Sequence, residues 1–121
     1  FLKQSFPNLT FAQFQRINAG KHFTEWACGE SFYQGSYHLT CCTAIFSAKY
    51  GYKMGLFCVN PRFRRQGIGK TFFQKLVERY HYLTWTAKSE ESLKFYQSIG
   101  AVNKGIITGI DGTKYTLFGS K

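Results

Sequence analysis

The chain has 121 residues, 44% of them hydrophobic, which fits a single domain over residues 1–121 with one buried core. No apolar run approaches the ~18 residues of a membrane-spanning helix, and the start of the chain has no apolar stretch long enough for a signal peptide, so we expect no membrane attachment. We expect the cysteines to be reduced thiols packed as small apolar groups, which predicts a cytoplasmic protein. The four cysteines form no C-x-x-C pair, which argues against a zinc site and a disulfide framework, and the net charge of +10 favours anionic partners.

The first half of the chain predicts a helix followed by three strands. Apolar residues recur with helical spacing over residues 8–18, and Gly20 should end that helix. Three stretches rich in aromatic, β-branched and cysteine residues come next, and Gly29, Gly35 and Gly51 are expected to form turns beside them. The antiparallel strands predicted from these stretches cover residues 23–27, 37–46 and 52–59.

The second half predicts two further helices. Pro61 should end the third strand, because proline cannot donate to a strand ladder. The apolar spacing then becomes helical over residues 68–80, and a short strand is expected over residues 82–86. Ser89 should cap the last helix, with Gly100 just beyond its end.

A hairpin is predicted at the end of the chain. Residues 102–110 and 114–118 have strand-like composition and flank Asp111-Gly112, a pair typical of hairpin turns. With the preceding elements, this order predicts a mixed α/β (α+β) fold, in which a mostly antiparallel sheet is flanked by helices.

The segment over residues 59–70 joins the third strand to the second helix. The first N–H groups of a helix have no partner within it, and the helix dipole adds positive charge at the same point. Gly67 and Gly69 have no Cβ, so an anion can approach the backbone there, and the segment predicts a phosphate cradle. Four basic side chains surround it: Arg62, Arg64, Arg65 and Lys70.

Two familiar nucleotide-binding motifs fail on spacing. The dinucleotide fingerprint G-x-G-x-x-G would need a third glycine where the chain has Phe72. A Walker loop ending in Gly69-Lys70-Thr71 would need its first glycine where the chain has Arg64.

Residues 64–69 and 89–101 resemble two characteristic segments of the GNAT superfamily of N-acetyltransferases. The sequence RRQGIG is similar to the family signature R/Q-x-x-G-x-G/A, and SEESLKFYQSIGA places Tyr96 and Gly100 on the tyrosine and glycine of the second segment. The resemblance covers roughly residues 37–118 and implies a GNAT-type sheet. It also implies transfer of an acetyl group from acetyl-coenzyme A (acetyl-CoA) to an amine, with no metal.

The resemblance further implies roles for single residues. Backbone N–H groups of residues 67–70 would hold the pyrophosphate of coenzyme A, and the backbone of residues 57–59 would bond its pantetheine arm. Tyr96 would protonate the leaving thiolate, although helical spacing alone would make it a core aromatic residue. The residues expected at the cofactor are Phe57, Cys58, Val59, Arg64, Arg65, Gln66, Gly67, Ile68, Gly69, Lys70, Ser89 and Ser92.

The general base is not identified by the sequence. The resemblance implies a glutamate near Gly55 or Leu56 in many members, and this chain has no carboxylate there. Glu25, Glu30, His38 or a relay through water are the remaining candidates, and no spacing singles one of them out.

The expected function is that of an N-acetyltransferase in which the amine attacks the thioester directly in a ternary complex. The alternatives are a catalytically degenerate GNAT fold that binds acyl-CoA as a sensor or interaction module, and a basic nucleic-acid-binding domain. A broadly basic surface repels free polyamines and aminoglycosides, so we expect the acceptor amine on a macromolecule that is acidic or bound to nucleic acid, such as a protein lysine, an N-terminus or an aminoacyl-tRNA. The N-terminal part is short for the family, and a homodimer is left open.

Overall fold

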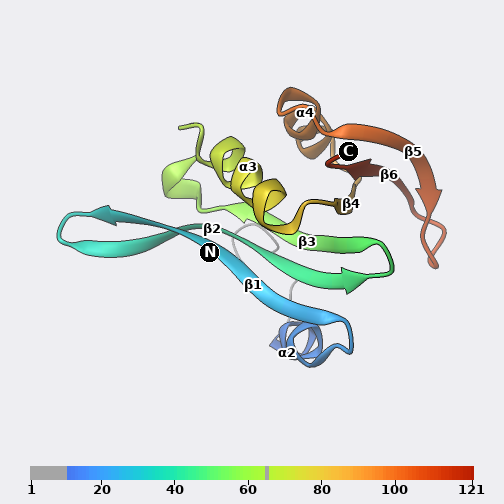
Figure 1. Ribbon diagram of the computed structural model, residues 1–121, viewed down its shortest axis with the longest axis horizontal. Helices are drawn as coiled ribbons and strands as arrows, with labels where there is room; N and C mark the ends of the chain where they lie inside the picture. Colours follow the sequence, from blue (N-terminus) through green and yellow to red (C-terminus); the bar gives the residue numbers. More distant parts are fainter. Residues whose placement is uncertain (1–10, 65) are drawn as a thin grey trace.

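In the part of the chain that the structure describes, six strands form one sheet and three helices pack around it (Figure 1). The computed structural model describes residues 11–64 and 66–121. In chain order the elements are α2 (Phe11–Ala19), β1 (Phe23–Tyr33), β2 (Ser36–Ala48), β3 (Gly51–Val59), the 3-10 turn η1 (Pro61–Phe63), α3 (Ile68–Tyr80), β4 (Leu83–Ala87), α4 (Glu90–Ser98), β5 (Val102–Thr108) and β6 (Lys114–Gly119). This order is the one expected from the sequence, although residues 8–10 of the first predicted helix lie outside the described residues.

The sheet has the strand order β1-β2-β3-β4-β6-β5. β3 and β4 run parallel, because α3 carries the chain back between them. The other neighbouring strands are antiparallel, which confirms the predicted mixed, mostly antiparallel sheet.

The helices lie on both faces of the sheet. Successive side chains of a strand point to opposite faces. On β1, Glu25 accepts a hydrogen bond from Tyr80 of α3, whereas Trp26 donates to Asn18 at the end of α2, so α3 and α2 cover opposite faces. Trp85 of β4 contacts aromatic rings of both α3 and α4, which places these two helices on the same face.

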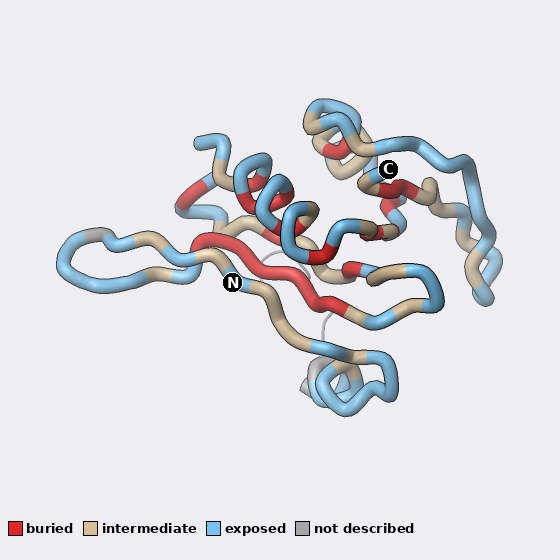
Figure 2. The backbone as a smooth tube through the Cα atoms, viewed as in Figure 1, coloured by how far each residue is buried: buried red, intermediate tan, exposed pale blue. Residues whose placement is uncertain are grey.

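The core lies between the sheet and the α3–α4 layer. Figure 2 shows a continuous buried run along β2 and a buried inner face of α3. The core is formed mainly by aromatic and aliphatic side chains of β2, β3, β4, β6 and the two helices: Cys41, Ile45, Met54, Phe72, Phe73, Leu76, Tyr80, Leu83, Trp85, Ala87, Tyr96 and Phe118.

The first strand is longer than expected. Gly29 lies inside β1 rather than in a turn, next to a bulge, and pairs with Cys41. A Cβ on Gly29 would lie 2.6 Å from the Cys41 Sγ, so the glycine allows the two strands to approach. The turn lies at Gln34-Gly35 instead, where both residues have positive φ, as a two-residue type I′ hairpin requires.

The second half of the chain follows the expected pattern closely. α3 covers the predicted residues 68–80, and α4 is capped by Ser89, whose Oγ accepts a hydrogen bond from the Ser92 N–H at 3.1 Å. The closing hairpin has a wider loop than a two-residue turn, because Gly109 donates to the Thr113 carbonyl across it.

Candidate functional site

β3 and β4 diverge soon after they pair. In the part of the chain that the structure describes, they pair only at Tyr52–Leu83 and Lys53–Thr84, although β3 continues to Val59 and β4 to Ala87. Beyond these pairs, the backbone groups of β3 that point away from β2 have no strand partner. An extended ligand could therefore add to β3 in a strand-like way, as expected for residues 57–59.

A bulge in β3 lies within this unpaired part. The register shifts so that Leu56 and Phe57 face the single residue Thr43 of β2. Leu56 has a φ of 53°, which is unfavourable for a side chain with a Cβ. The buried Thr43 hydroxyl stabilises the distortion by donating to the Gly55 carbonyl at 2.8 Å. A bulge bends its strand, and this one lies just beyond the last pair between β3 and β4, Lys53–Thr84.

The N-terminus of α3 presents the expected anion cradle. Gly67 is the N-cap residue with a φ of 75°, and a Cβ placed there would meet nothing within 4 Å, so space is free at this point. The N–H groups of residues 68–70 belong to the first helical turn, which carries no acidic side chain. This positive, open helix end could hold a phosphate group.

Gly69 has a different role from the one expected. A Cβ at this position would lie 3.1 Å from the Phe95 ring and 3.2 Å from a methyl group of Val59. The missing side chain of Gly69 therefore lets α4 and the end of β3 pack closely against α3. The prediction that Gly69 opens the backbone to an anion is therefore corrected. Phe95 and Val59 occupy the space where its Cβ would lie, so an anion cannot approach from that side.

Two of the basic side chains around the cradle already contact other groups of the protein. Arg64 donates through Nε to the Val59 carbonyl at 3.1 Å, so it folds back along the end of β3. Arg62 lies over the Phe63 ring, with its guanidinium carbon 5.9 Å from the ring centre. Gln66 and Lys70 are exposed, and Arg65 lies outside the described residues.

Tyr96 of α4 packs against rings of both diverging strands. Its ring centre lies 6.1 Å from that of Phe57 on β3 and 5.2 Å from that of Trp85 on β4. Burial, with a smaller contribution from Cys58, raises the pKa of Tyr96 above its usual value. The phenol is therefore neutral at physiological pH and can donate its proton in a hydrogen bond.

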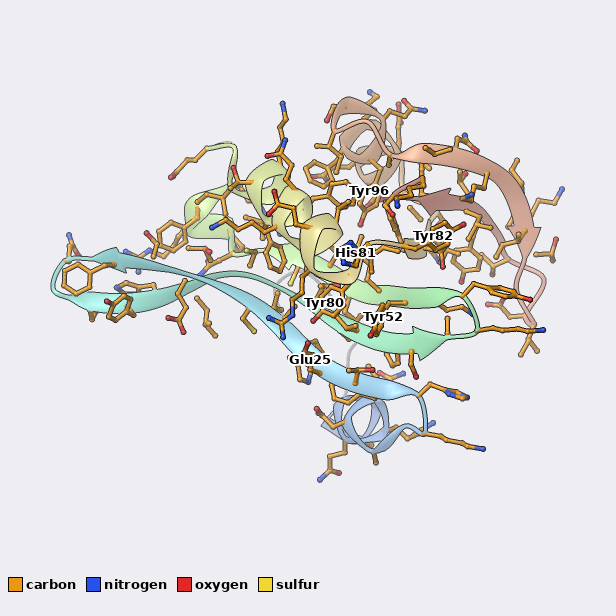
Figure 3. The ribbon with its side chains drawn as sticks, in the orientation of Figure 1. Glu25, Tyr52, Tyr80, His81, Tyr82 and Tyr96 are labelled. Carbon is orange, nitrogen blue, oxygen red and sulfur yellow. The ribbon has the colours of Figure 1, made fainter. Side chains whose placement is uncertain are left out.

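Glu25, one of the candidate bases, lies away from Tyr96. Figure 3 shows Glu25 and Tyr80 close together near the C-terminal end of α3, apart from Tyr96. Glu25 accepts the Tyr80 hydroxyl hydrogen and pairs with Arg79 at 3.4 Å. His38 is hydrogen-bonded to the Ser36 hydroxyl at 3.1 Å. Glu25 therefore acts as a structural acceptor that ties β1 to α3.

A cavity of about 630 Å³ lies between β1, β2 and α3. Its lining includes Glu25 and Tyr80 at one end and Gln66 and Gly67 at the N-terminus of α3. Glu30 and Thr40 also line it. The cavity thus adjoins the anion cradle from the β1 side.

The cysteines are free thiols, and Cys42 and Cys58 form a cross-strand pair with their sulfur atoms 3.5 Å apart. Residues 11–64 and 66–121 contain no group of three or more His, Cys, Asp or Glu side chains that could hold a metal ion. None of the helices in these ranges is both long and apolar enough to cross a membrane.

A family model described as an acetyltransferase (GNAT) domain matches residues 43–116, more than half of the chain. Comparison with curated proteins finds no match. Among solved structures, an aminoglycoside 6′-N-acetyltransferase complexed with coenzyme A has a TM-score of 0.72 at 10% identity, covering 98% of this chain and 85% of that one.

Two further structures have the same fold. The ribosomal-protein-S18-alanine N-acetyltransferase from Escherichia coli has a TM-score of 0.65 at 14% identity, over 92% of this chain and 76% of that one. Ard1 from Thermoplasma volcanium has a TM-score of 0.67 at 16% identity, over 97% of this chain and 84% of that one. The match to the family model assigns the family, and these similarities support the fold.

Proposed function

Because this chain belongs to the GNAT acetyltransferase family, we propose that it is an active N-acetyltransferase that transfers an acetyl group from acetyl-CoA to an amine. The observation that carries the proposal is the position of Tyr96, which spans the diverging strands β3 and β4 on the same face of the sheet as α3. The open N-terminus of α3 lies at the end of β3, so a phosphate-bearing donor can reach from the cradle along this strand.

The donor is held by backbone groups. The N–H groups of residues 67–70 bind its pyrophosphate, and Lys70 and Arg64 add positive charge beside them. The pantetheine arm bonds to those backbone groups of Phe57, Cys58 and Val59 that point away from β2, apart from the Val59 carbonyl, which already accepts from Arg64 Nε. Ser89 and Ser92 lie at the start of α4, where the Ser89 hydroxyl already accepts the Ser92 N–H, so Ser89 shapes the site mainly by capping this helix.

The reaction is a direct attack without a covalent enzyme intermediate. The amine nitrogen bonds to the thioester carbonyl carbon, and the carbon–sulfur bond breaks. Tyr96 donates its hydroxyl hydrogen to the leaving sulfur as negative charge develops there. A thiol has a pKa of ~8.5, below that of the buried tyrosine, so the phenol gives up its hydrogen only as it gains the proton released by the amine, and Tyr96 is neutral at the end of the cycle.

A second function is favoured by one observation. Leu56 lies in the bulge, near the position where many family members have a glutamate base. Glu25 accepts a hydrogen bond from Tyr80 and forms an ion pair with Arg79. A chain without a base at the site could bind acyl-CoA as a sensor or interaction module. Turnover of acetyl-CoA in the presence of an amine separates this function from the enzyme.

The acceptor is proposed to be an amine on an acidic or nucleic-acid-bound macromolecule, met in the cytoplasm. The net charge of +10 supports this proposal, because a basic surface attracts such partners. The similar structures differ in their acceptors, since one is a ribosomal-protein-S18-alanine N-acetyltransferase and another an aminoglycoside 6′-N-acetyltransferase. Dimerisation also remains a prediction.

Binding of the donor is tested at Gly67. Gly67→Leu should abolish the rise in melting temperature that acetyl-CoA gives the unmodified protein, because the new side chain fills the cradle. Gly100→Leu is the matched control, since Gly100 has a similar φ of 83° with free space around it and lies beyond α4. Calorimetry that detects no acetyl-CoA binding by the unmodified protein would refute the proposed function.

A further inference from the structure

Trp85 lies where β3 and β4 separate. The last pair between these strands joins Lys53 to Thr84, so Trp85 is the first residue of β4 beyond it. Its side chain is only 4% exposed and points to the face covered by α3 and α4, because it contacts rings of both helices. The indole therefore lies at the base of the divergence, on the face of the sheet where Tyr96 lies.

The indole nitrogen is a buried donor without an acceptor. Trp85 Nε1 has no hydrogen-bond partner among the described residues. The other tryptophan of the chain differs, because Trp26 Nε1 donates to the Asn18 side chain at 2.7 Å. A buried N–H that makes no hydrogen bond destabilises the protein, so an unpaired donor beside a candidate site needs an explanation.

The surroundings of Trp85 supply mainly aromatic rings. Those of Phe73, Tyr96 and Phe118 have centres 5.3, 5.2 and 6.1 Å away. Phe73 and Phe118 carry no side-chain acceptor. Tyr96 carries a hydroxyl, but in the proposed reaction this group serves the leaving sulfur. An acceptor for the indole can instead come from a bound molecule that enters beside Tyr96.

We propose that the Trp85 N–H binds a carbonyl oxygen of the acyl-pantetheine end of the donor, an inference that rests on the proposed function. Amide and thioester carbonyls are the acceptors that this part of the donor offers. The nitrogen has almost no exposed surface, so the ring of Tyr96 or Trp85 moves when the donor enters. The hydrogen bond therefore forms on binding and orients the thioester beneath the Tyr96 hydroxyl.

Nuclear magnetic resonance of the full chain tests this proposal directly. The two tryptophans give two indole N–H signals, which Trp26→Phe assigns. Acetyl-CoA should move the Trp85 proton downfield and slow its exchange with solvent. Adenosine 3′,5′-bisphosphate, which occupies only the nucleotide end, should leave the Trp85 signal in place. The Trp26 signal is the internal control, because its hydrogen bond to Asn18 lies on the other face of the sheet.

The outcomes separate the two proposals. If acetyl-CoA shifts the amide signals of residues 67–70 while the Trp85 indole signal stays in place or moves upfield, the role of Trp85 is refuted and the proposed function stands. If neither set of signals responds, the proposed function fails together with the role of Trp85.

Substitution gives a second readout. Trp85→Phe keeps an aromatic ring and removes the N–H, so the dissociation constant for acetyl-CoA should rise by about tenfold, the effect of losing one hydrogen bond. Its affinity for adenosine 3′,5′-bisphosphate should not change. A general loss of folding would instead weaken the binding of both ligands. Trp26→Phe should leave both affinities unchanged. Equal weakening of both ligands in Trp85→Phe would assign Trp85 a packing role only.

Discussion

Tyr96 combines two properties at the residue scale, since it packs in the core and also spans the diverging strands. Tyr96→Phe keeps the ring contacts with Phe57 and Trp85 and removes the hydroxyl. We expect kcat to fall by about ten- to a thousand-fold, because the leaving sulfur loses its proton donor. The melting temperature and the dissociation constant for acetyl-CoA should stay close to those of the unmodified protein. Unchanged kcat would leave Tyr96 as a core residue.

Tyr80 predicts a loss of stability at high pH. Burial and the hydrogen bond to Glu25 raise the pKa of Tyr80 to about 12, whereas an unfolded tyrosine titrates near ~10. The unfolded chain therefore loses this proton first, and the free energy of unfolding should decrease as the pH rises from ~10 to 12. Tyr80→Phe should weaken this decrease, measured by urea unfolding at several pH values. A pH dependence identical in both proteins would contradict the prediction.

At the element scale, α3 and α4 can pack closely because Gly69 of α3 has no side chain. Gly69→Val would place atoms against Phe95 and the Val59 methyl group, which already lie 3.1 and 3.2 Å from a Cβ at this position. Overpacking of this kind costs about 1–3 kcal/mol, so the melting temperature should fall. Acetyl-CoA binding should weaken as well, because α4 carries Tyr96 and α3 carries the cradle.

The control for this variant lies on the same helix. Gln74→Val introduces the same β-branched residue at an exposed position of α3, so it reports the helix propensity alone. Equal stability of the two variants would show that the close approach at Gly69 does not matter.

The sequence predicts local elements well and long-range register poorly. α3 and the Ser89 cap follow from apolar spacing and capping chemistry, which act over a few residues. The bulge at Leu56 depends on how Thr43 of β2 meets β3, and no local pattern in β3 signals a positive φ at a leucine. Gly29 was expected to mark a turn, but it lies within a strand because Cys41 approaches it from the next strand.

The candidate site also has some features that local sequence predicts and others that depend on distant residues. The start of α3 after Gly67 and the position of Tyr96 on α4 could be predicted from two short segments of sequence, whereas anion binding at this helix end stays a prediction. The hydrogen bond from Tyr80 to Glu25 could not be predicted, since the two residues are 55 positions apart in the chain. The unpaired Trp85 N–H also escaped sequence analysis, because it depends on the packing of β4, β6 and both helices.

The charge of the whole molecule predicts its acceptor class. Coenzyme A itself is anionic, so the cradle accounts for part of the net charge of +10. Other basic residues lie far from the cradle in the chain, among them Lys21, Lys49, Lys53, Lys88, Lys94, Lys104, Lys114 and Lys121. These charges attract an acidic macromolecule over distances of about the Debye length, which shrinks to ~8 Å at physiological ionic strength.

The specificity constant, kcat/KM, for a macromolecular acceptor should therefore fall steeply as salt rises from low to physiological concentration, by about tenfold or more. Charged tRNA and an acidic protein are the acceptors to compare, with spermidine as a cationic control whose rate should be low at every salt concentration. The KM for acetyl-CoA, measured at each salt concentration, separates screening at the donor cradle from screening at the acceptor. Efficient acetylation of spermidine, with no activity on proteins or charged tRNA, would overturn the acceptor class. That result would leave the proposed donor site intact, because the proposed roles of the cradle at the pyrophosphate and of Tyr96 at the leaving sulfur do not depend on which amine attacks.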